Sequence, residues 1–415
     1  MSALRRITAD DVERERRPAV DPITLGEAAA IVEDVRRRGE AAVREHGERL
    51  GDLRPGAEIV LEREDLVRAL NTLEPKPRAA LERSASRIHG FARHQRSCLA
   101  DLDVGIDGGR AGHRWLPVRT AGAYAPGGRY PLPSSVLMTV VPARAAGVEE
   151  IWVASPRPTP STLAAAAIAG ADGLLAVGGA QAVAALALGT FAAPADVVVG
   201  PGNRWVTAAK KHLVGEVGID GLAGPSEIVV VADAAADASL VAADLLAQAE
   251  HDTDALPILV ATSAEVLDAV DRAVADLLAS LPTAHVAAVS IEHGAAVVTS
   301  GLDEAAELCN RLAPEHLALH LAEARTAAER FTSYGSLFVG AATAEAFADY
   351  GAGPNHVLPT GGGARYQSGL SVATFLRAPT WMALTSPAVL VADTVRLAGL
   401  EGLEAHARSA QARAR

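Results

Sequence analysis

The chain has 415 residues, of which 49% are hydrophobic and 21% charged, and its formal net charge is −12. This composition is typical of a folded α/β enzyme with two or three domains, and it excludes a disordered or fibrous chain. The negative charge is spread along the sequence, which argues against nucleic acid or an anionic membrane as the main partner.

Cysteine usage and charge distribution bear on the compartment. Only Cys98 and Cys309 occur, so no disulfide framework is predicted and a reducing cytoplasm is expected. The opening MSALRRITADDVERERR has no apolar core and is not expected to be a secretory signal.

Residues 173–195 carry no charge, but glycine, proline and many alanines interrupt the apolar run. We therefore predict a buried βα segment there and no membrane span.

The first hundred residues are predicted to form mainly charged helices, over residues 27–50, 64–73 and 83–96. From Val118 onward, short apolar runs bounded by glycine and proline alternate with alanine-rich helical segments. The runs EEIWVASP, GLLAVGG and ADVVVGPGN start about 23 residues apart, a spacing typical of βα units that feed a parallel sheet.

A second series of apolar runs follows, and we predict strands at SEIVVVAD, LPILVATS, HVAAVSI and GSLFVGA. The predicted fold class is α/β, with two incomplete Rossmann-like, doubly wound parallel-sheet domains and helical N-terminal and C-terminal extensions. After about Ser386 the chain is predicted to return to helix. A free helix of that length is marginal in water, so we expect the tail to pack against something.

Three glycine-rich turns follow predicted strands of the first series, at Gly127-Gly128, Gly178-Gly179 and Gly200-Pro201-Gly202. The third turn departs from the dinucleotide fingerprint GxGxxG, because Trp205 stands where the last glycine is required. Each turn alone is as readily a tight βα connection as a phosphate site. Together they favour a nucleotide site without the standard fingerprint, since each is followed by a polar side chain: Arg129, Gln181 and Asn203.

The segment LLAQAEH places Gln248 and His251 three residues apart, and therefore on one face of a helix. Polar helix ends are common, so this pair alone does not specify a ligand site. Joined by a distant aspartate and histidine, the pair would form a mixed nitrogen and oxygen shell suited to zinc.

Three other histidines stand in contexts that suggest function. His316 follows Pro314 and Glu315, which places an acid beside an imidazole where a helix must stop. His356 lies in a loop after the last predicted strand, and His406 lies near the C-terminus.

Cys309 invites comparison with a catalytic thiol. It stands mid-helix with no basic residue three or four positions away, so a thiolate is not favoured. We predict that Cys309 packs in the core.

A set of long motifs resembles the histidinol dehydrogenases in order and approximate spacing, from about residue 30 to the C-terminus. They are GAYAPGGRYPLPSSVLM, VGGAQAVAALALGT, VVVGPGN, AGPSEI, LLAQAEHD, CNRLAPEHLAL, DYGAGPNHVLPT, SGLSV and EGLEAHA. Motifs of this length are shared by no common fold signature, so the resemblance is specific.

The resemblance implies a role for each matching residue. One zinc ion per subunit would be held by Gln248, His251, Asp349 and His406. Glu315 and His316 match the family's catalytic pair. Substrate contacts would fall on Ser134, Ser226, His356 and Glu401, together with the four zinc ligands and His316. Contacts to the NAD cofactor would fall on Tyr124, Gln181 and Asn203.

The resemblance also implies a domain plan and a homodimer. Residues 1–20 would form an N-terminal arm, and residues 21–123 with 229–380 a first Rossmann-like domain. Residues 124–228 would form the second, cofactor-binding domain. Residues 381–415 would be a helical tail that docks on the partner subunit and contributes to its active site.

The implied reaction is the oxidation of L-histidinol to L-histidine through the aldehyde, with two NAD and one water. His316 would take the hydroxyl proton as hydride leaves, and Glu315 would activate water to attack the aldehyde. The substrate is thus a small molecule, and neither nucleic acid nor a membrane is expected as a partner.

Two alternatives remain at this point. Related members oxidise other small alcohols, including a sulfonated propanediol, and Arg129 close to Ser134 would suit such an anion. Glu401 and His356 favour histidinol. A catalytically silent metal- or nucleotide-binding protein is the other alternative, which the Glu315-His316 pair and the complete ligand set argue against.

Overall fold

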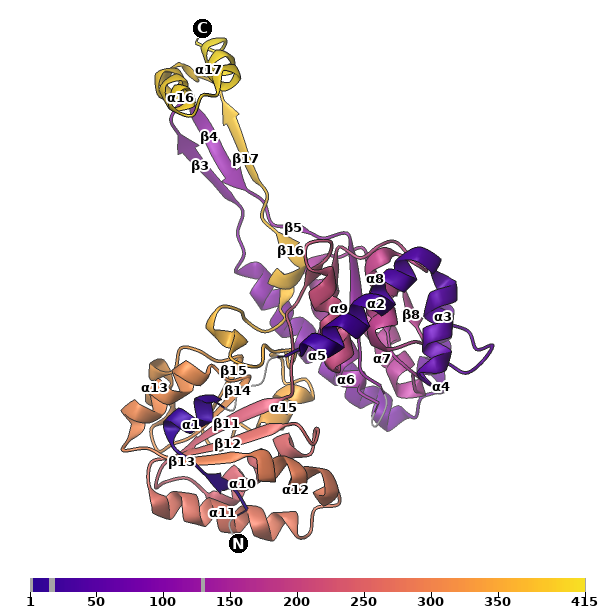
Figure 1. The fold of residues 1–415 in the computed structure, drawn as a ribbon, viewed down its shortest axis with the longest axis vertical. Coiled ribbons are helices and arrows are strands. Elements are labelled where there is room, and N and C mark those ends of the chain that lie inside the picture. The colour runs from indigo at the N-terminus through magenta and orange to yellow at the C-terminus, as the bar shows by residue number, and fades with distance from the viewer. Residues whose placement is uncertain (1–2, 15–18, 128–130, 415) are drawn as a thin grey trace.

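Two parallel β-sheets, each with helices on both faces, form the body of the protein, and a narrow arm projects from it (Figure 1). The computed structural model describes residues 3–14, 19–127 and 131–414. The predicted α/β class with two doubly wound parallel sheets is confirmed. Within the described ranges, no helix has the length and apolar character needed to cross a membrane.

The first sheet, here called sheet I, is wound outward in both directions from β6. Its strand order is β10 (Gly218–Ile219), β9 (Val197–Val199), β6 (Thr120–Tyr124), β7 (Glu150–Ala154), β8 (Gly173–Leu175) and β2 (Val60–Glu62). All neighbours are parallel except β2, which pairs antiparallel with β8. The winding reverses between β6 and β9, which is the position where doubly wound sheets bind ligands.

Helices cover both faces of sheet I. One face packs against α2 (Pro22–Arg38), α3 (Glu40–Arg49), α8 (Gly179–Leu188) and α9 (Arg204–Leu213). The other face packs against α4 (Arg63–Thr72), α5 (Pro75–Ser97), α6 (Pro133–Ala146) and α7 (Pro160–Ala169).

The second sheet, sheet II, has the same winding around β11. Its order is β1 (Arg5–Arg6), β13 (Ala295–Val298), β12 (Leu256–Ala261), β11 (Glu227–Ala232), β14 (His316–His320) and β15 (Ser336–Val339), all parallel. One face carries α10 (Ala238–Ala249), α11 (Ala264–Leu278), α12 (Ala284–His293) and α15 (Glu345–Asp349). The other carries α1 (Ala9–Arg14), α13 (Leu302–Leu312) and α14 (Ala324–Ala327).

The continuous apolar run of β11 follows from burial on both faces. Ile228 and Val230 lie in the core under α10, whereas Val229 and Val231 lie in the core under α13. Successive side chains of a strand point to opposite faces, so a central strand of a covered parallel sheet must be apolar at every position.

The arm consists of an antiparallel three-stranded sheet and two terminal helices (Figure 1). Its strands are β3 (Leu102–Ile106), β4 (Gly109–His113) and β17 (Thr380–Leu384), and its helices are α16 (Ala388–Leu400) and α17 (Glu404–Gln411). A short antiparallel pair, β5 (Leu116–Pro117) with β16 (Leu376–Arg377), lies at its base. The return to helix after Ser386 is confirmed, whereas the hairpin of β3 and β4 was not predicted.

The grouping of segments differs from the predicted domain plan. Residues 21–123 were expected to join residues 229–380, but α2 to α5 pack on sheet I and β2 pairs with β8. Sheet II is instead completed by the N-terminal strand β1. An amphipathic helix displays an apolar face but does not encode which sheet will cover it, so the sequence pattern could not decide this point.

One predicted strand is wrong, and several strands were not predicted. The run HVAAVSI lies in α12, where Val286, Ala287, Ser290 and Ile291 are buried at helical spacing. The next strand is β13, directly after that helix. Among the strands that were not predicted, β14 bears on the site, because it is the neighbour of β11 on its other side.

Candidate active site

The end of α10 brings two predicted ligands to one place. Gln248 is fully buried, and among the described residues neither its amide oxygen nor its nitrogen has a hydrogen-bond partner. The His251 side chain, just beyond the helix, is 45% exposed. A buried amide without hydrogen-bond partners is costly, which is consistent with a side chain that binds a ligand.

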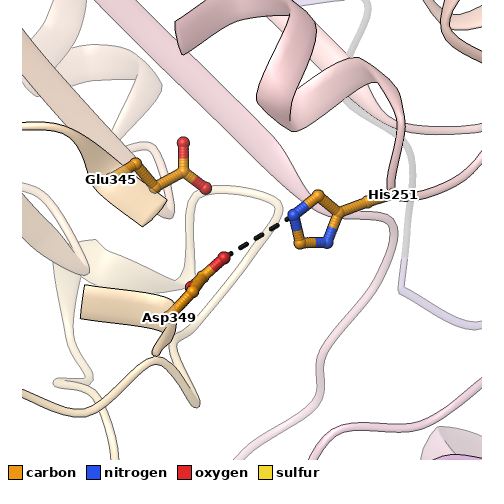
Figure 2. Close-up of side chains that lie close together, drawn as sticks. All are labelled: His251, Glu345 and Asp349. Carbon is orange, nitrogen blue, oxygen red and sulfur yellow. Dashed lines mark ion pairs between the residues drawn. The ribbon is translucent and has the colours of Figure 1, made fainter. Parts of the chain in front are cut away.

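The short helix α15 faces this end of α10 and carries two carboxylates at positions i and i+4. Figure 2 shows His251 facing Asp349, with Nε2 to Oδ2 at 3.6 Å, and Glu345 beside them. One donor atom from each of the three side chains lies within 4.8 Å of the others. This spacing of imidazole and carboxylate donors is suited to a divalent cation such as zinc.

Glu345 is a member of this group that the sequence did not suggest. It is 2% exposed, and within the described chain its carboxylate oxygens accept no hydrogen bond. Burial, and then the charge of Asp349, raise its pKa well above the ordinary value. Its position four residues before Asp349 was the one available signal, because it places both carboxylates on one helix face.

The Glu315-His316 pair lies at the amino end of β14. The helix α13 ends at Ala313 in the left-handed conformation (φ 47°), Pro314 follows, and the strand begins at His316. His316 Nδ1 lies 3.0 Å from the Glu227 carbonyl, and the Glu227 N–H donates to Glu315 Oε2 at 2.9 Å. Since a carbonyl only accepts, Nδ1 carries the proton, and the lone pair of neutral His316 is on Nε2.

Burial governs the titration of both members. It lowers the pKa of His316 to about 4, against the opposing charge of Asp349. Burial also raises the pKa of Glu315 well above its ordinary value, and the nearby Glu227 and Glu345 carboxylates add to that rise. His316 is therefore a neutral imidazole at physiological pH, able to accept a proton.

His356 connects this site to sheet I. Its Nδ1 lies 3.1 Å from the Asp349 carbonyl, and its Nε2 lies 3.4 Å from the Ser135 hydroxyl on α6. The predicted substrate contact Ser134 is the residue before Ser135. Ser226 directly precedes β11, where its carbonyl accepts from the Leu256 N–H at 2.9 Å. Ser226 thus lies at the start of the strand that pairs with the His316 strand, and Ser134 lies on α6 next to the contact of Ser135 with His356.

The three predicted cofactor residues lie together at the carboxyl edge of sheet I. Tyr124 ends β6, Gln181 lies in the first turn of α8, and Asn203 caps α9 by accepting from two backbone N–H groups. The Tyr124 hydroxyl accepts from the Gly179 N–H at 3.2 Å, and burial raises the pKa of Tyr124 to about 12. This edge includes the reversal point between β6 and β9, as expected for a nucleotide site.

Only one of the two polar atoms of the Gln181 amide forms a hydrogen bond within the described residues. Its Nε2 donates to Asp52 at 3.3 Å, while within the described residues its buried Oε1 has no hydrogen-bond partner. Asp52, on the loop after α3, is a neighbour that the sequence did not indicate.

Two predicted site residues lie elsewhere in this chain. Glu401 caps the end of α16 and His406 lies on α17, both exposed at the tip of the arm, far from α10 and α15 (Figure 1). A single chain therefore does not bring them to His251 and Asp349. Arg129, which bears on the alternative substrate, lies outside the described residues.

Cys309 packs in the core as predicted. It is fully buried on α13 among the apolar residues under sheet II, and burial raises the pKa of its thiol. A thiol in this state is not a nucleophile.

The fold and the site together define a class. Two Rossmann-like sheets, a cofactor edge on one and a buried imidazole–carboxylate pair on the other are the features of an NAD-dependent α/β oxidoreductase. The family model for histidinol dehydrogenase matches residues 15–414, and the chain belongs to that family.

Relatives and solved structures agree with this assignment. The chain is 45% identical to a histidinol dehydrogenase of Ruegeria pomeroyi, over 97% of this chain and 94% of the relative. It is 44% identical to that of Thermus thermophilus, over 94% of each. The crystal structure of histidinol dehydrogenase from Elizabethkingia anophelis aligns with a TM-score of 0.92 at 29% identity, covering 100% of this chain and 98% of that one.

A more distant similarity concerns the fold alone. A betaine aldehyde dehydrogenase from Staphylococcus aureus aligns with a TM-score of 0.51 at 12% identity, over 91% of this chain and 88% of that chain.

Proposed function

We propose that this chain oxidises L-histidinol to L-histidine through histidinal, with zinc and two molecules of NAD. The observation that carries the proposal is the group of His251, Glu345 and Asp349 beside the buried Glu315-His316 pair. Gln248, one helical turn before His251, has an unpartnered buried amide. The names of the relatives and the family match support the substrate.

The donor set fits zinc. Gln248, His251 and Asp349 supply a neutral oxygen, a nitrogen and an anionic oxygen, and the unsatisfied Gln248 amide supports a role as ligand. When bound, zinc would supply a Lewis acid for anchoring the substrate. The Glu345 carboxyl group, whose pKa is raised by burial, adds a further oxygen donor next to this position.

His316 is suited to the alcohol step. Its Nδ1–H is held by the Glu227 carbonyl, so the ring presents Nε2 and its tautomer does not change. Nε2 would accept the hydroxyl proton of the substrate. Tyr124, Gln181 and Asn203 would hold NAD, which would supply the hydride acceptor.

Glu315 is suited to the aldehyde step. A carboxylate with a raised pKa is a stronger base than an ordinary one. Glu315 would take a proton from the water that attacks the aldehyde carbon, and a second NAD would supply the acceptor for the second hydride.

A homodimer would complete the site. The arm exposes Leu102, Val104, Ile106, Met382, Val389, Leu397, Leu400 and Leu403, and Phe347 and Tyr350 are exposed next to Asp349. Exposed apolar surface of this extent marks an interaction site. We propose that the arm of one subunit docks on the other, so that Glu401 and His406 of each chain reach the partner's His251 and Asp349.

The location that we propose is the cytoplasm. Both cysteines are free in the structure, Cys98 exposed and Cys309 buried, which suits a reducing compartment.

The proposal is tested by NADH formation with purified protein. We expect two NADH per L-histidinol and little reaction with a panel of small diols, amino alcohols and a sulfonated propanediol. A preference for the sulfonated diol would assign the chain to a related alcohol oxidation, and inactivity with the whole panel would contradict an enzymatic role.

A further inference from the structure

A buried ion pair lies directly behind the glycine turn at the cofactor edge. Lys210, on α9, is 2% exposed, and its Nζ contacts the carboxylate of Asp220, whose side chain is 4% exposed. Lys210 Nζ also donates to the Gly200 carbonyl at 3.0 Å, and Asp220 Oδ2 accepts from the Gly200 N–H at 2.6 Å. Both polar groups of one glycine are therefore held by the two charges.

Gly200 occupies a position that only glycine tolerates. Its φ is +112°, and a Cβ at this residue would lie 2.0 Å from the carbonyl oxygen of Tyr124. The turn thus packs against the end of β6, beside the predicted cofactor residue Tyr124. Asp220 is itself anchored, because Gln367 Nε2 donates to its carbonyl at 3.0 Å.

The pair fixes both ends of the segment that carries Asn203. Gly200 begins the turn, Asn203 caps α9, and Lys210 lies on the same helix. A charged pair at this depth is costly to desolvate, and apolar residues of similar volume would fill the space at lower cost. What an apolar pair could not do is bind the N–H and the carbonyl of Gly200 together and so set the orientation of that peptide.

We propose that Lys210 and Asp220 are positioning residues for the cofactor, which hold the turn from Gly200 to Asn203 in the conformation that binds NAD. This inference rests on the proposed function, in which Tyr124, Gln181 and Asn203 contact NAD. Neither Lys210 nor Asp220 touches the substrate or the metal position in this role.

The test compares Lys210→Met, Asp220→Asn and the double variant with wild type. Asp220→Asn keeps an acceptor of the same shape, and the double variant leaves no unpaired buried charge, so at least one of the three is expected to fold. We expect the KM and the Kd for NAD to rise roughly tenfold, with kcat at saturating NAD and the KM for histidinol within about twofold of wild type.

A matched control is available at the opposite edge of the same sheet. Arg144 contacts Asp172 and donates from Nε to the Gly170 carbonyl at 2.8 Å. Asp172 in turn accepts from the Ile151 N–H at 2.8 Å. Arg144→Met should lower stability while the KM for NAD stays unchanged. An equal rise in that KM for Arg144→Met would mean that general loosening of the domain, and not positioning, causes the effect.

Asn203→Ala separates the two proposals. If Asn203→Ala weakens NAD binding while the double variant binds NAD like wild type, the positioning role is overturned and the cofactor site stands. If wild type does not bind NAD in direct calorimetry, the proposed function itself fails.

Discussion

His316 combines deep burial with a neutral ring, and this has a consequence for stability. Burial lowers its pKa from 6.5 to about 4, so the folded state disfavours the imidazolium. Because the pKa of His316 is lower in the folded state, the neutral ring stabilises the fold above pH 6.5, and this stabilisation is lost as the pH falls through about 4. The free energy of unfolding falls by about 3 kcal/mol over this range.

We expect the unfolding free energy of the metal-free protein to fall between pH 6.5 and 4 more steeply in wild type than in His316→Asn, which lacks the titrating ring. Urea unfolding at several pH values measures the difference. Parallel curves for the two proteins would show that His316 does not titrate in this range.

Glu315 is the second residue whose chemistry can be isolated. Glu315→Gln keeps the acceptor for the Glu227 N–H but removes the base for water. We expect oxidation of supplied aldehyde to fall by about 10²-fold or more and alcohol oxidation to fall much less. Single-turnover rates with each substrate measure this, and zinc content serves as the control. Equal losses in both steps would contradict the assignment.

At the scale of elements, two helix ends build the metal position that we propose. The end of α10 supplies Gln248 and His251, and α15 supplies Asp349. We expect His251→Ala and Asp349→Ala to remain folded and to lose zinc, as measured by elemental analysis. His285→Ala, an exposed imidazole on the neighbouring α12, is the matched control and should keep its metal. Stoichiometric zinc in both site variants would contradict the proposed metal position.

At the scale of the whole molecule, the arm decides whether the active site is shared. The helices α16 and α17, which carry Glu401 at the end of the first and His406 on the second, form the tip of the arm (Figure 1). A swapped dimer would therefore combine His316 of one chain with His406 of the other. Inactive His316→Ala and His406→Ala subunits should then complement after exchange. In a mixed dimer one site carries both defects and the other carries none.

Random pairing makes about half the dimers mixed, so roughly a quarter of wild-type activity should return in a two-fold symmetric dimer. Subunit exchange is verified with differently tagged chains. No recovery after verified exchange would place His406 in its own chain's site.

Features that depend on a few neighbouring residues could be predicted from the sequence. The spacing of Gln248 and His251 places both at one helix end, and Pro314 stops a helix just before the Glu315-His316 pair. The glycine turns at Gly178-Gly179 and Gly200 follow β8 and β9 at the carboxyl edge of sheet I. These predictions succeed because helix periodicity, proline sterics and tight turns are local properties of the backbone.

Other features were decided only by the tertiary structure. The helices α2 to α5 cover sheet I, HVAAVSI is helical, and Glu345 joins His251 and Asp349. The hairpin of β3 and β4 had one local sequence signal, the Asp107-Gly108 turn between its strands. No local sequence signal indicated that the arm would project from the body. An apolar face or a lone carboxylate does not specify its neighbour in space. The neighbour of each surface is decided when distant segments pack. The burial of apolar surface is non-directional, so it favours whichever surfaces the whole chain brings together.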